Sequence, residues 1–265
     1  MISFDAPPDF FLPLHAAGRH AAEAGDADRA GTQAGVLDRV ISSYTPTIRA
    51  LEHARQRSAS HRGGSPAALI VAMPETPAAD RLPGATREAA DVARLVRGSL
   101  VLAGPEATSD TVRSAIAEYQ VAHFACHGLS DPLDPGSSRL LLYDHAAKPL
   151  TVAALSTLRL RNAGLAFLSA CSTARSSERL ADEVVHITAA FQLAGYSRVI
   201  GTLWLIRDSV AAAMCGEVYS LLTSGGTGPV RLDESADAVH TATRRLRERF
   251  PRSPSAWAAF VHFGA

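Results

Sequence analysis

Two reactive side chains stand where apolar segments of this sequence end. Leu165 to Ala170 is a short apolar run, and Cys171 follows it directly, ahead of small polar residues. Upstream, an apolar run that begins at Val121 stops at the pair His127-Gly128. A thiol reacts as its thiolate, and an imidazole that titrates near neutral pH can accept the thiol proton. The two segment ends therefore offer the components of a cysteine–histidine dyad.

The other cysteines and histidines near this motif have simpler interpretations. Cys126 lies inside the apolar run, and Cys215 follows Met214 in an amphipathic segment, so we interpret both as buried structural residues. His123 lies four residues before His127 on the same expected strand, and we interpret it as a hydrogen-bonded core histidine. Gly128 removes side-chain bulk next to the imidazole and allows a backbone N–H to approach a substrate carbonyl.

The segments that must position these side chains alternate between strand and helix patterns. Strands are expected at 36–43, 67–73, 99–103, 121–128, 165–170, 198–204 and 258–263, with a hairpin at 139–144. Helices are expected at 45–56, 82–98, 109–119, 151–158, 182–195, 208–222 and 237–250. This alternation predicts an α/β fold with a mostly parallel sheet covered on both faces. Sites in such sheets form outside the carboxyl ends of the strands, which is where His127 and Cys171 are placed.

The composition excludes several classes of function. Among 265 residues, 26 basic and 26 acidic side chains give a formal net charge of +0, which gives no electrostatic reason to expect nucleic acid or an acidic membrane surface as a partner. No apolar run reaches the roughly 18 residues of a membrane helix, and the first residues lack the basic-then-apolar pattern of a secretion signal, so we expect a cytoplasmic protein. Three cysteines are too few for a disulfide framework.

Metal binding is the rival chemistry for this region. His123, Cys126, His127 and Cys171 include ligand types, but residues three and four apart on a strand do not converge as they would on a helix. Gly225 to Gly228 follows a helix rather than linking a strand to a helix, so we interpret it as a flexible connection rather than a phosphate loop. We expect neither a metal nor a cofactor.

The sequence resembles the CHAT domain, a caspase-like family related to separases, gingipains and clostripain, over nearly its whole length. The resemblance rests on seven segments in this order, which are 12–18, 42–47, 123–128, 168–174, 181–183, 191–195 and 201–204. Among them are His123-Phe124-Ala125-Cys126-His127-Gly128, Leu168-Ser169-Ala170-Cys171-Ser172-Thr173-Ala174 and Gly201-Thr202-Leu203-Trp204. The resemblance implies a caspase-like three-layer αβα sandwich. We expect one domain over 1–265, with a partly flexible strand and loop at 1–35 and a flexible loop at 57–66.

The resemblance also implies an endopeptidase. Cys171 would be the nucleophile, His127 the general acid and base, and the backbone amides of Gly128 and Cys171 the oxyanion hole. Separases that prefer arginine carry an acidic residue after the Leu-Trp strand, and Asp208 holds that place here. Asp208 is therefore the candidate pocket acid, with Asp182 and Trp204 as further candidates. Asp208 equally suits the N-cap of its own helix, and the two roles are compatible.

Two hypotheses follow from the sequence. The first is a cysteine endopeptidase that cleaves a protein or peptide substrate in a regulated process such as signalling, defence or cell death, latent without an activating partner. The second is a non-catalytic interaction or scaffold module of the same fold. CHAT domains usually lie behind helical repeats or beside sensor modules, so such a module is the expected partner.

Overall fold

The centre of the molecule is a six-stranded sheet in the order β2-β1-β3-β7-β8-β9. The computed structural model describes residues 35–60, 66–131, 133–169, 180–204 and 206–265. Five strands run parallel, and β9 at the edge pairs antiparallel with β8. The strands are β1 (Ala68–Ala72), β2 (Leu100–Ala103), β3 (Val121–Ala125), β7 (Leu165–Leu168), β8 (Arg198–Thr202) and β9 (Phe260–Gly264).

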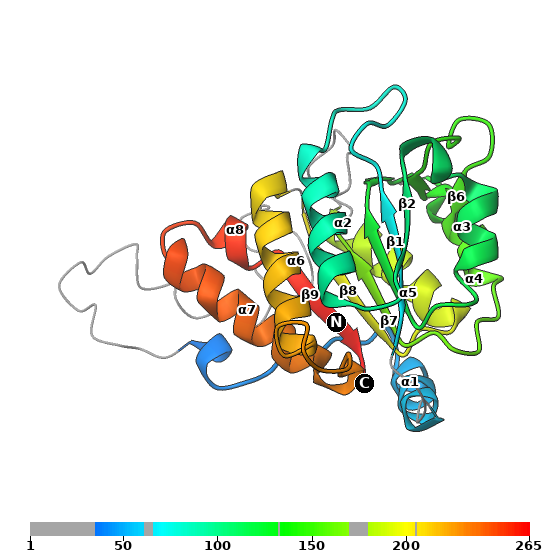
Figure 1. Ribbon diagram of the computed structural model, residues 1–265. Coiled ribbons are helices and arrows are strands. Elements are labelled where there is room, and N and C mark those ends of the chain that lie inside the picture. Colours follow the sequence, from blue (N-terminus) through cyan, green and yellow to red (C-terminus); the bar gives the residue numbers. More distant parts are fainter. Residues whose placement is uncertain (1–34, 61–65, 132, 170–179, 205) are drawn as a thin grey trace.

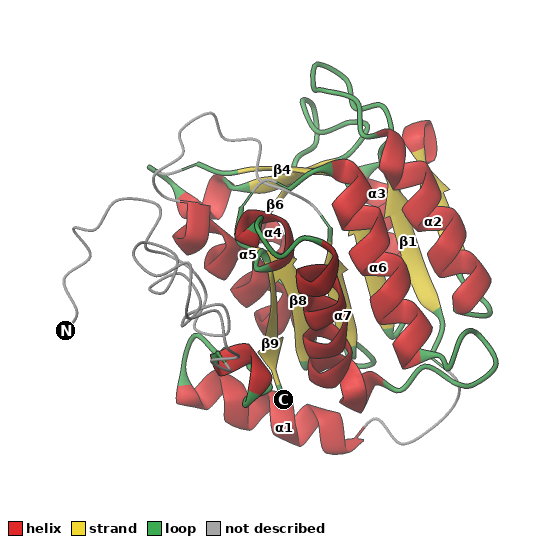
Figure 2. Ribbon diagram, turned by 90° about the vertical axis from the view of Figure 1, so that its left-hand side faces the viewer, coloured by secondary structure: helices red, strands yellow, loops and turns green. Residues whose placement is uncertain are grey.

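Helices cover both faces of this sheet, as Figures 1 and 2 show. The helices of the chain are α1 (Ile48–Ser60), α2 (Pro83–Leu95), α3 (Ser109–Ala115), α4 (Val152–Ser156), α5 (Leu180–Ala194), α6 (Asp208–Leu222), α7 (Ser235–Arg249) and α8 (Pro254–Trp257). Side chains of α2, α6 and α7 form one core with alternate strand residues, and side chains of α3, α4 and α5 form the other core with the intervening residues. The predicted three-layer αβα fold is confirmed.

A small second sheet carries the histidine of the candidate dyad. Its antiparallel order is β4 (His127–Leu129), β5 (Arg139–Leu141) and β6 (Leu150–Thr151). The predicted hairpin at 139–144 is confirmed in part. Strand β5 pairs with β4, and Leu141 of β5 lies opposite His127. This sheet follows directly from the carboxyl end of β3, where functional loops of parallel sheets gather.

Several details of the predicted elements were wrong. The segment 36–43 is not a strand, and it contains a 3-10 turn at Val36–Asp38. Thr47 rather than Thr45 caps α1, because its hydroxyl oxygen accepts a hydrogen bond from the amide of Ala50. Helix α1 continues to Ser60, so 57–60 is not loop. Helix α3 ends at Ala115, short of the predicted 119.

A further wrong detail concerns the site. His123 and His127 do not share a strand, because β3 ends at Ala125 and the chain turns at Cys126 before β4 begins. Strand β2 lies within its predicted segment, and β9 extends one residue beyond its predicted end, to Gly264. The expected N-terminal strand lies outside the described residues. In the described part of the chain, none of the helices has the length and apolar character to cross a membrane.

Candidate active site

His127 is held at the carboxyl edge of the central sheet. It is the first residue of β4, where it pairs with Leu141, and it is only 4% exposed. Gly128 follows in the same strand opposite Leu140 and is buried. The turn at Cys126 separates this pair from β3, so the small sheet rather than the central one fixes the backbone of His127.

The imidazole of His127 has one occupied and one open nitrogen. Its Nε2 lies 2.7 Å from the backbone carbonyl oxygen of Asp80. Because a carbonyl oxygen only accepts, Nε2 is the nitrogen that donates and carries the proton. The Nδ1 atom is buried and has no hydrogen-bond partner among the described residues. A neutral imidazole in this tautomer presents an Nδ1 lone pair that can accept a proton.

The Asp80 carbonyl belongs to the loop between β1 and α2. This loop is closed by the hydrogen bond from the amide of Leu82 to the carbonyl of Pro74, 2.9 Å long. Nε2 of His145 donates to the carbonyl oxygen of Pro77 in the same loop, 2.9 Å away. The sequence does not reveal that the Asp80 carbonyl orients His127, because any residue type has a backbone carbonyl.

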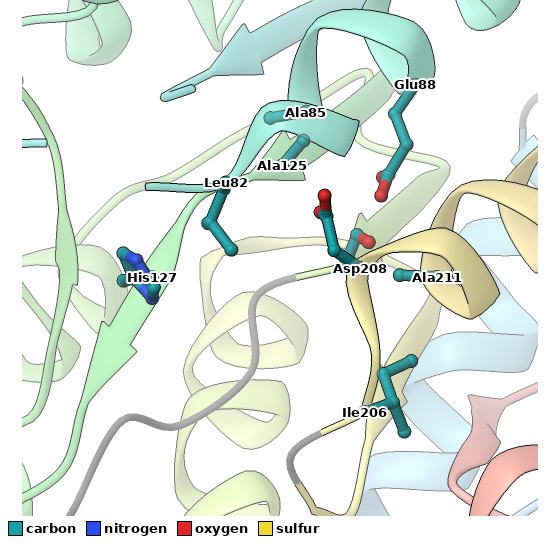
Figure 3. Close-up of a pocket in the computed structure, with 9 residues that line it drawn as sticks. Leu82, Ala85, Glu88, Ala125, His127, Ile206, Asp208 and Ala211 are labelled. Atoms are coloured by element: carbon teal, nitrogen blue, oxygen red, sulfur yellow. The ribbon is translucent and has the colours of Figure 1, made fainter. Parts of the chain in front are cut away.

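A hollow opens beside His127 between α2 and the start of α6 (Figure 3). Its water-accessible space is about 30 Å³, and the empty space including its open mouth is about 360 Å³. Its walls combine apolar side chains with two carboxylic acids and His127, and they comprise Leu82, Ala85, Glu88, Ala125, His127, Ser169, Ile206, Asp208 and Ala211. An apolar hollow with a few convergent polar groups is typical of a side-chain-binding pocket.

Asp208 lies in this hollow, as expected of a pocket acid. Its Oδ2 accepts a hydrogen bond from the backbone N–H of Gly84 in the first turn of α2. A Cβ at position 84 would lie 2.5 Å from the Asp208 carboxylate, so glycine is required for this approach. The interpretation of Asp208 as N-cap of its own helix was wrong, because Arg207 is the N-cap residue and Asp208 caps α2 instead.

Glu88 is a second acid of the hollow that the sequence analysis missed. It is 2% exposed, and its Oε2 lies 3.2 Å from Nε2 of His123. His123 is fully buried, but its ring nitrogens have no partner in hydrogen-bond geometry, so its expected hydrogen bond was not found. Glu88 falls on the apolar stripe formed by Ala85, Ala89 and Val92, and a charged residue on such a stripe is the signal that could have identified it.

The remaining predicted residues are placed only in part. Cys171 lies outside the described residues, and the last residue described before it, Ser169, lines the hollow and donates its amide to the Phe124 carbonyl at the end of β3. Asp182 lies in the first turn of α5. Trp204 is not among the residues that line the hollow, and its indole N–H donates to the Ser255 carbonyl, 2.7 Å away.

The structure brings together a different set of metal-ligand types from the one that the sequence suggested, which was His123, Cys126, His127 and Cys171. Among the described residues, Glu88, His123 and Cys215 place one ligand atom each within 4.8 Å of one another. Burial, together with the charges of Glu88 and Asp91, raises the pKa of the Cys215 thiol well above its usual value. Burial likewise raises the pKa of Cys126 to about 12. Both thiols are therefore neutral at physiological pH, as expected of structural cysteines.

Comparison with known proteins assigns the fold to a family. The model of the CHAT domain matches residues 10–265. The chain belongs to the CHAT-domain family. Its sequence is 26% identical to tetratricopeptide repeat protein 28 of Homo sapiens in an alignment 265 positions long. The alignment covers 83% of this chain and 10% of that protein. This CHAT domain thus spans about a tenth of the length of that relative.

Solved structures similar to this CHAT domain are caspase-like peptidases. The Arg-specific cysteine proteinase gingipain R has a TM-score of 0.51 and 12% identity, over 81% of this chain and 51% of that one. The Saccharomyces cerevisiae separase in complex with securin has a TM-score of 0.55 and 13% identity, over 84% of this chain and 14% of that one. At these identities the likeness establishes the caspase-like fold.

Proposed function

We propose that this CHAT domain is a caspase-like cysteine endopeptidase. The observation that carries the proposal is the orientation of His127, whose Nε2 is fixed by the Asp80 carbonyl while its buried Nδ1 has no partner in the described part of the chain. A general base needs a fixed tautomer and an open lone pair toward the proton that it removes. The hollow beside it supplies space for a substrate side chain.

The proposed reaction uses His127 in both directions. Nδ1 of His127 accepts the thiol proton of Cys171, and the thiolate attacks the carbonyl carbon of the scissile bond. The resulting imidazolium donates that proton to the leaving amine as the C–N bond breaks, leaving a thioester on Cys171. A water molecule, deprotonated by His127, then hydrolyses the thioester and frees the thiol. The backbone N–H groups of Gly128 and Cys171 are the proposed donors to the oxyanion.

The hollow is the proposed pocket for the residue before the scissile bond. Asp208 lies in it and gives it negative charge, which favours a basic side chain. Asp182 remains a candidate for its border, whereas Trp204 does not line it. Gingipain R, which shares this fold, is described as Arg-specific, and this agrees with the proposed preference.

The proposed partners are proteins. The relative tetratricopeptide repeat protein 28 contains helical repeats by its name, and the similar separase structure is a complex with securin. We propose that a sensor or helical-repeat partner activates this domain in a regulated process in the cytoplasm, such as defence or programmed cell death.

The experiment compares cleavage of a peptide library by the full chain and by its Cys171→Ala variant. Even without the activating partner the full chain should show basal cleavage, and the variant should lose this activity by roughly 10³-fold or more, because the thioester cannot form. Cleavage that persists in the variant would refute the dyad. Absence of covalent labelling of Cys171 by electrophilic peptide probes in the full chain would favour the alternative of a non-catalytic interaction module.

Asp208→Asn should lower kcat/KM for substrates with lysine or arginine before the scissile bond by about 10- to 100-fold, because hydrogen bonds to charged groups contribute roughly 1.5–3 kcal/mol. Asparagine keeps an acceptor for the Gly84 amide, so substrates with neutral residues should be cleaved as before. Gly84→Ala should reproduce the loss without removing the charge, since its Cβ displaces the Asp208 carboxylate. Equal losses for basic and neutral substrates would argue against Asp208 as a pocket acid.

A further inference from the structure

We infer that Asp208 is a positioning residue for His127, and that it acts by capping helix α2. Its effect reaches the imidazole through the β1–α2 loop, residues 73–82, which contains the Asp80 carbonyl. The inference rests on the proposed function, because it gives the candidate pocket acid a second role in holding the general base. It concerns a hydrogen bond of the imidazole, so its failure can be distinguished from failure of the proposed peptidase.

Helix α2 has no side-chain cap of its own. Its N-cap residue is Leu82, whose side chain cannot accept a hydrogen bond, and its first residue is Pro83, which has no N–H. The next amide, that of Gly84, donates to Oδ2 of Asp208 at the start of α6. The amide of Ala85 donates to the Leu82 carbonyl, 3.0 Å away. Asp208 therefore supplies, from another helix, the cap that α2 lacks.

The chain has a glycine where this contact requires one. A Cβ at position 84 would lie 2.5 Å from the carboxylate carbon of Asp208, so a larger residue would push the carboxylate away. Glycine is otherwise an unfavourable residue inside a helix. The carboxylate also lies at the N-terminal end of α2, where the helix dipole favours a negative charge.

The β1–α2 loop is held in a strained conformation between two anchors. Ala78 has a φ of 60°, in the left-handed region that is unfavourable for a residue with a side chain. Such a conformation persists only where the surrounding structure restrains it. At its first residue the loop is fixed to the sheet, because the amide of Met73 donates to the Ala125 carbonyl, 2.9 Å away. At its other end it continues into the turn of α2 that Asp208 caps.

Asp80 lies between these anchors, four residues before Gly84. Its carbonyl accepts the proton of Nε2 of His127, 2.7 Å away, and thereby orients the ring. Among the described residues, Asp208 is bonded to Gly84 and not to His127, and Figure 3 shows the side chain of Leu82 between the two. Asp208 therefore acts on the imidazole through the backbone. Loss of the cap should allow the loop to relax and should weaken the bond to Nε2.

The role of Asp208 as an acceptor can be separated from the role of its charge. A carboxylate near an imidazole stabilises the protonated ring, and Glu88 and Asp208 are the two carboxylic acids of the hollow that His127 lines. Asp208→Asn removes the charge but keeps an oxygen that can accept the Gly84 amide. Asp208→Ala removes both. The difference between these two variants isolates the cap, since Glu88 is present in each.

The test measures the exchange of the Nε2 proton of His127 with water, by NMR of the full chain labelled with ¹⁵N in its histidine rings. The spectrum of His127→Gln assigns the signal, and the pH is kept above the ordinary imidazole pKa of about 6.5. The proton should exchange about tenfold faster in Asp208→Ala than in the wild type, because a hydrogen bond is weakened. Asp208→Asn should exchange as the wild type does.

Asp91→Ala is the matched control. Asp91 is a carboxylate of α2 that pairs with Arg87 and Arg94 on the same helix and does not line the hollow, so its loss should leave the exchange rate unchanged. Circular dichroism verifies that each variant is folded. Asp208→Leu, which also lacks an acceptor, replaces Asp208→Ala if the alanine variant does not fold.

Equal exchange in Asp208→Ala and the wild type would overturn the inference, and so would equally fast exchange in Asp208→Asn and Asp208→Ala. If the chain is active, Asp208→Ala should also lower kcat/KM for substrates with neutral residues by about tenfold, an effect that Asp208→Asn should not show. A chain that shows the expected exchange rates but never cleaves a peptide would refute the peptidase and leave this inference standing. Cleavage of neutral substrates at the wild-type rate by Asp208→Ala, with unchanged exchange, would refute the inference alone.

Discussion

Replacing His127 with alanine should lower kcat/KM for the best library substrate by about 10³- to 10⁴-fold, the range over which a general base and nucleophile activator contributes. The reason is that Nδ1 of His127 is buried and has no hydrogen-bond partner among the described residues, and no other described group offers a proton acceptor at that position. Steady-state kinetics on the purified chain measure the effect. Circular dichroism should show an unchanged fold, because the residue lies at the edge of the small sheet.

The matched control is His145→Ala. His145 also binds a carbonyl of the β1–α2 loop, that of Pro77, but it does not line the hollow. Loss of the His145 side chain should change kcat/KM by less than about tenfold, since this side chain affects catalysis only by holding the β1–α2 loop in place. Comparable losses in the two variants would mean that the loop, and not the imidazole of His127, is what catalysis requires.

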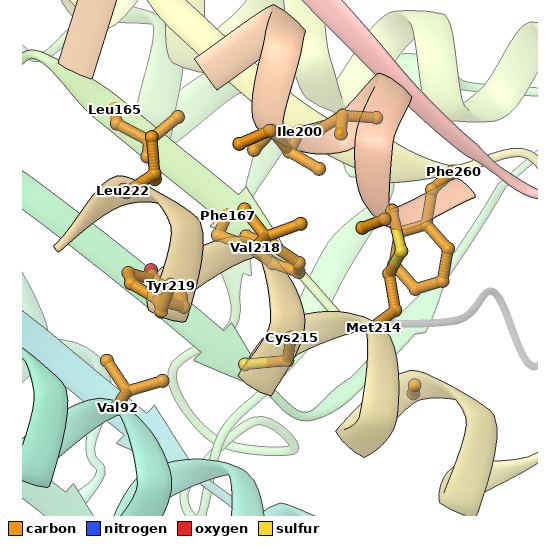
Figure 4. Close-up of a cluster of buried hydrophobic side chains, with 14 of the residues drawn as sticks. Val92, Leu165, Phe167, Ile200, Met214, Cys215, Val218, Tyr219, Leu222 and Phe260 are labelled. Carbon is orange, nitrogen blue, oxygen red and sulfur yellow. The ribbon is translucent and has the colours of Figure 1, made fainter. Parts of the chain in front are cut away.

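Phe167→Ala should lower the free energy of unfolding by about 3–5 kcal/mol. Phe167 is fully buried in the middle of β7, where it stacks on Tyr219 with ring centroids 5.6 Å apart and contacts Phe260 at 6.2 Å (Figure 4). Its removal leaves a cavity that these surrounding side chains cannot close. Urea denaturation followed by fluorescence measures the change.

Phe250→Ala provides the comparison for this core variant. Phe250 is 39% exposed at the end of α7, so its truncation should cost about 1 kcal/mol or less. A Phe167 variant no less stable than the Phe250 variant would contradict the proposed core.

Much of the scaffold was predictable because its signals are local. The apolar runs at 67–73 and 198–204 and the amphipathic stripe at 208–222 predicted β1, β8 and α6, and the last was predicted with its observed bounds. Asp208 was predicted to be a pocket acid from its position after the Leu203-Trp204 segment, and in the structure it lines the hollow. These features depend on periodicity and order along the chain, which a single sequence contains.

The missed features depend on contacts between distant segments. The bond from His127 to Asp80 joins β4 to the β1–α2 loop through a backbone atom. The break at Cys126 was missed because the apolar run continues through it, so that nothing in the composition marks where one sheet ends and the other begins. Asp208 was assigned to cap its own helix, but the packing of α2 against α6 gives it the amide of Gly84 instead.

The most direct test is the rate of alkylation of Cys171 by iodoacetamide as a function of pH, in the wild type and in His127→Ala. Cys126 and Cys215 are fully buried with raised thiol pKa values, so mass spectrometry should find modification at Cys171 alone. If His127 accepts the Cys171 proton, the wild-type thiolate should persist to about pH 6, whereas the variant should follow an ordinary thiol with a pKa of about 8.5. Identical pH profiles for the two proteins would contradict the dyad.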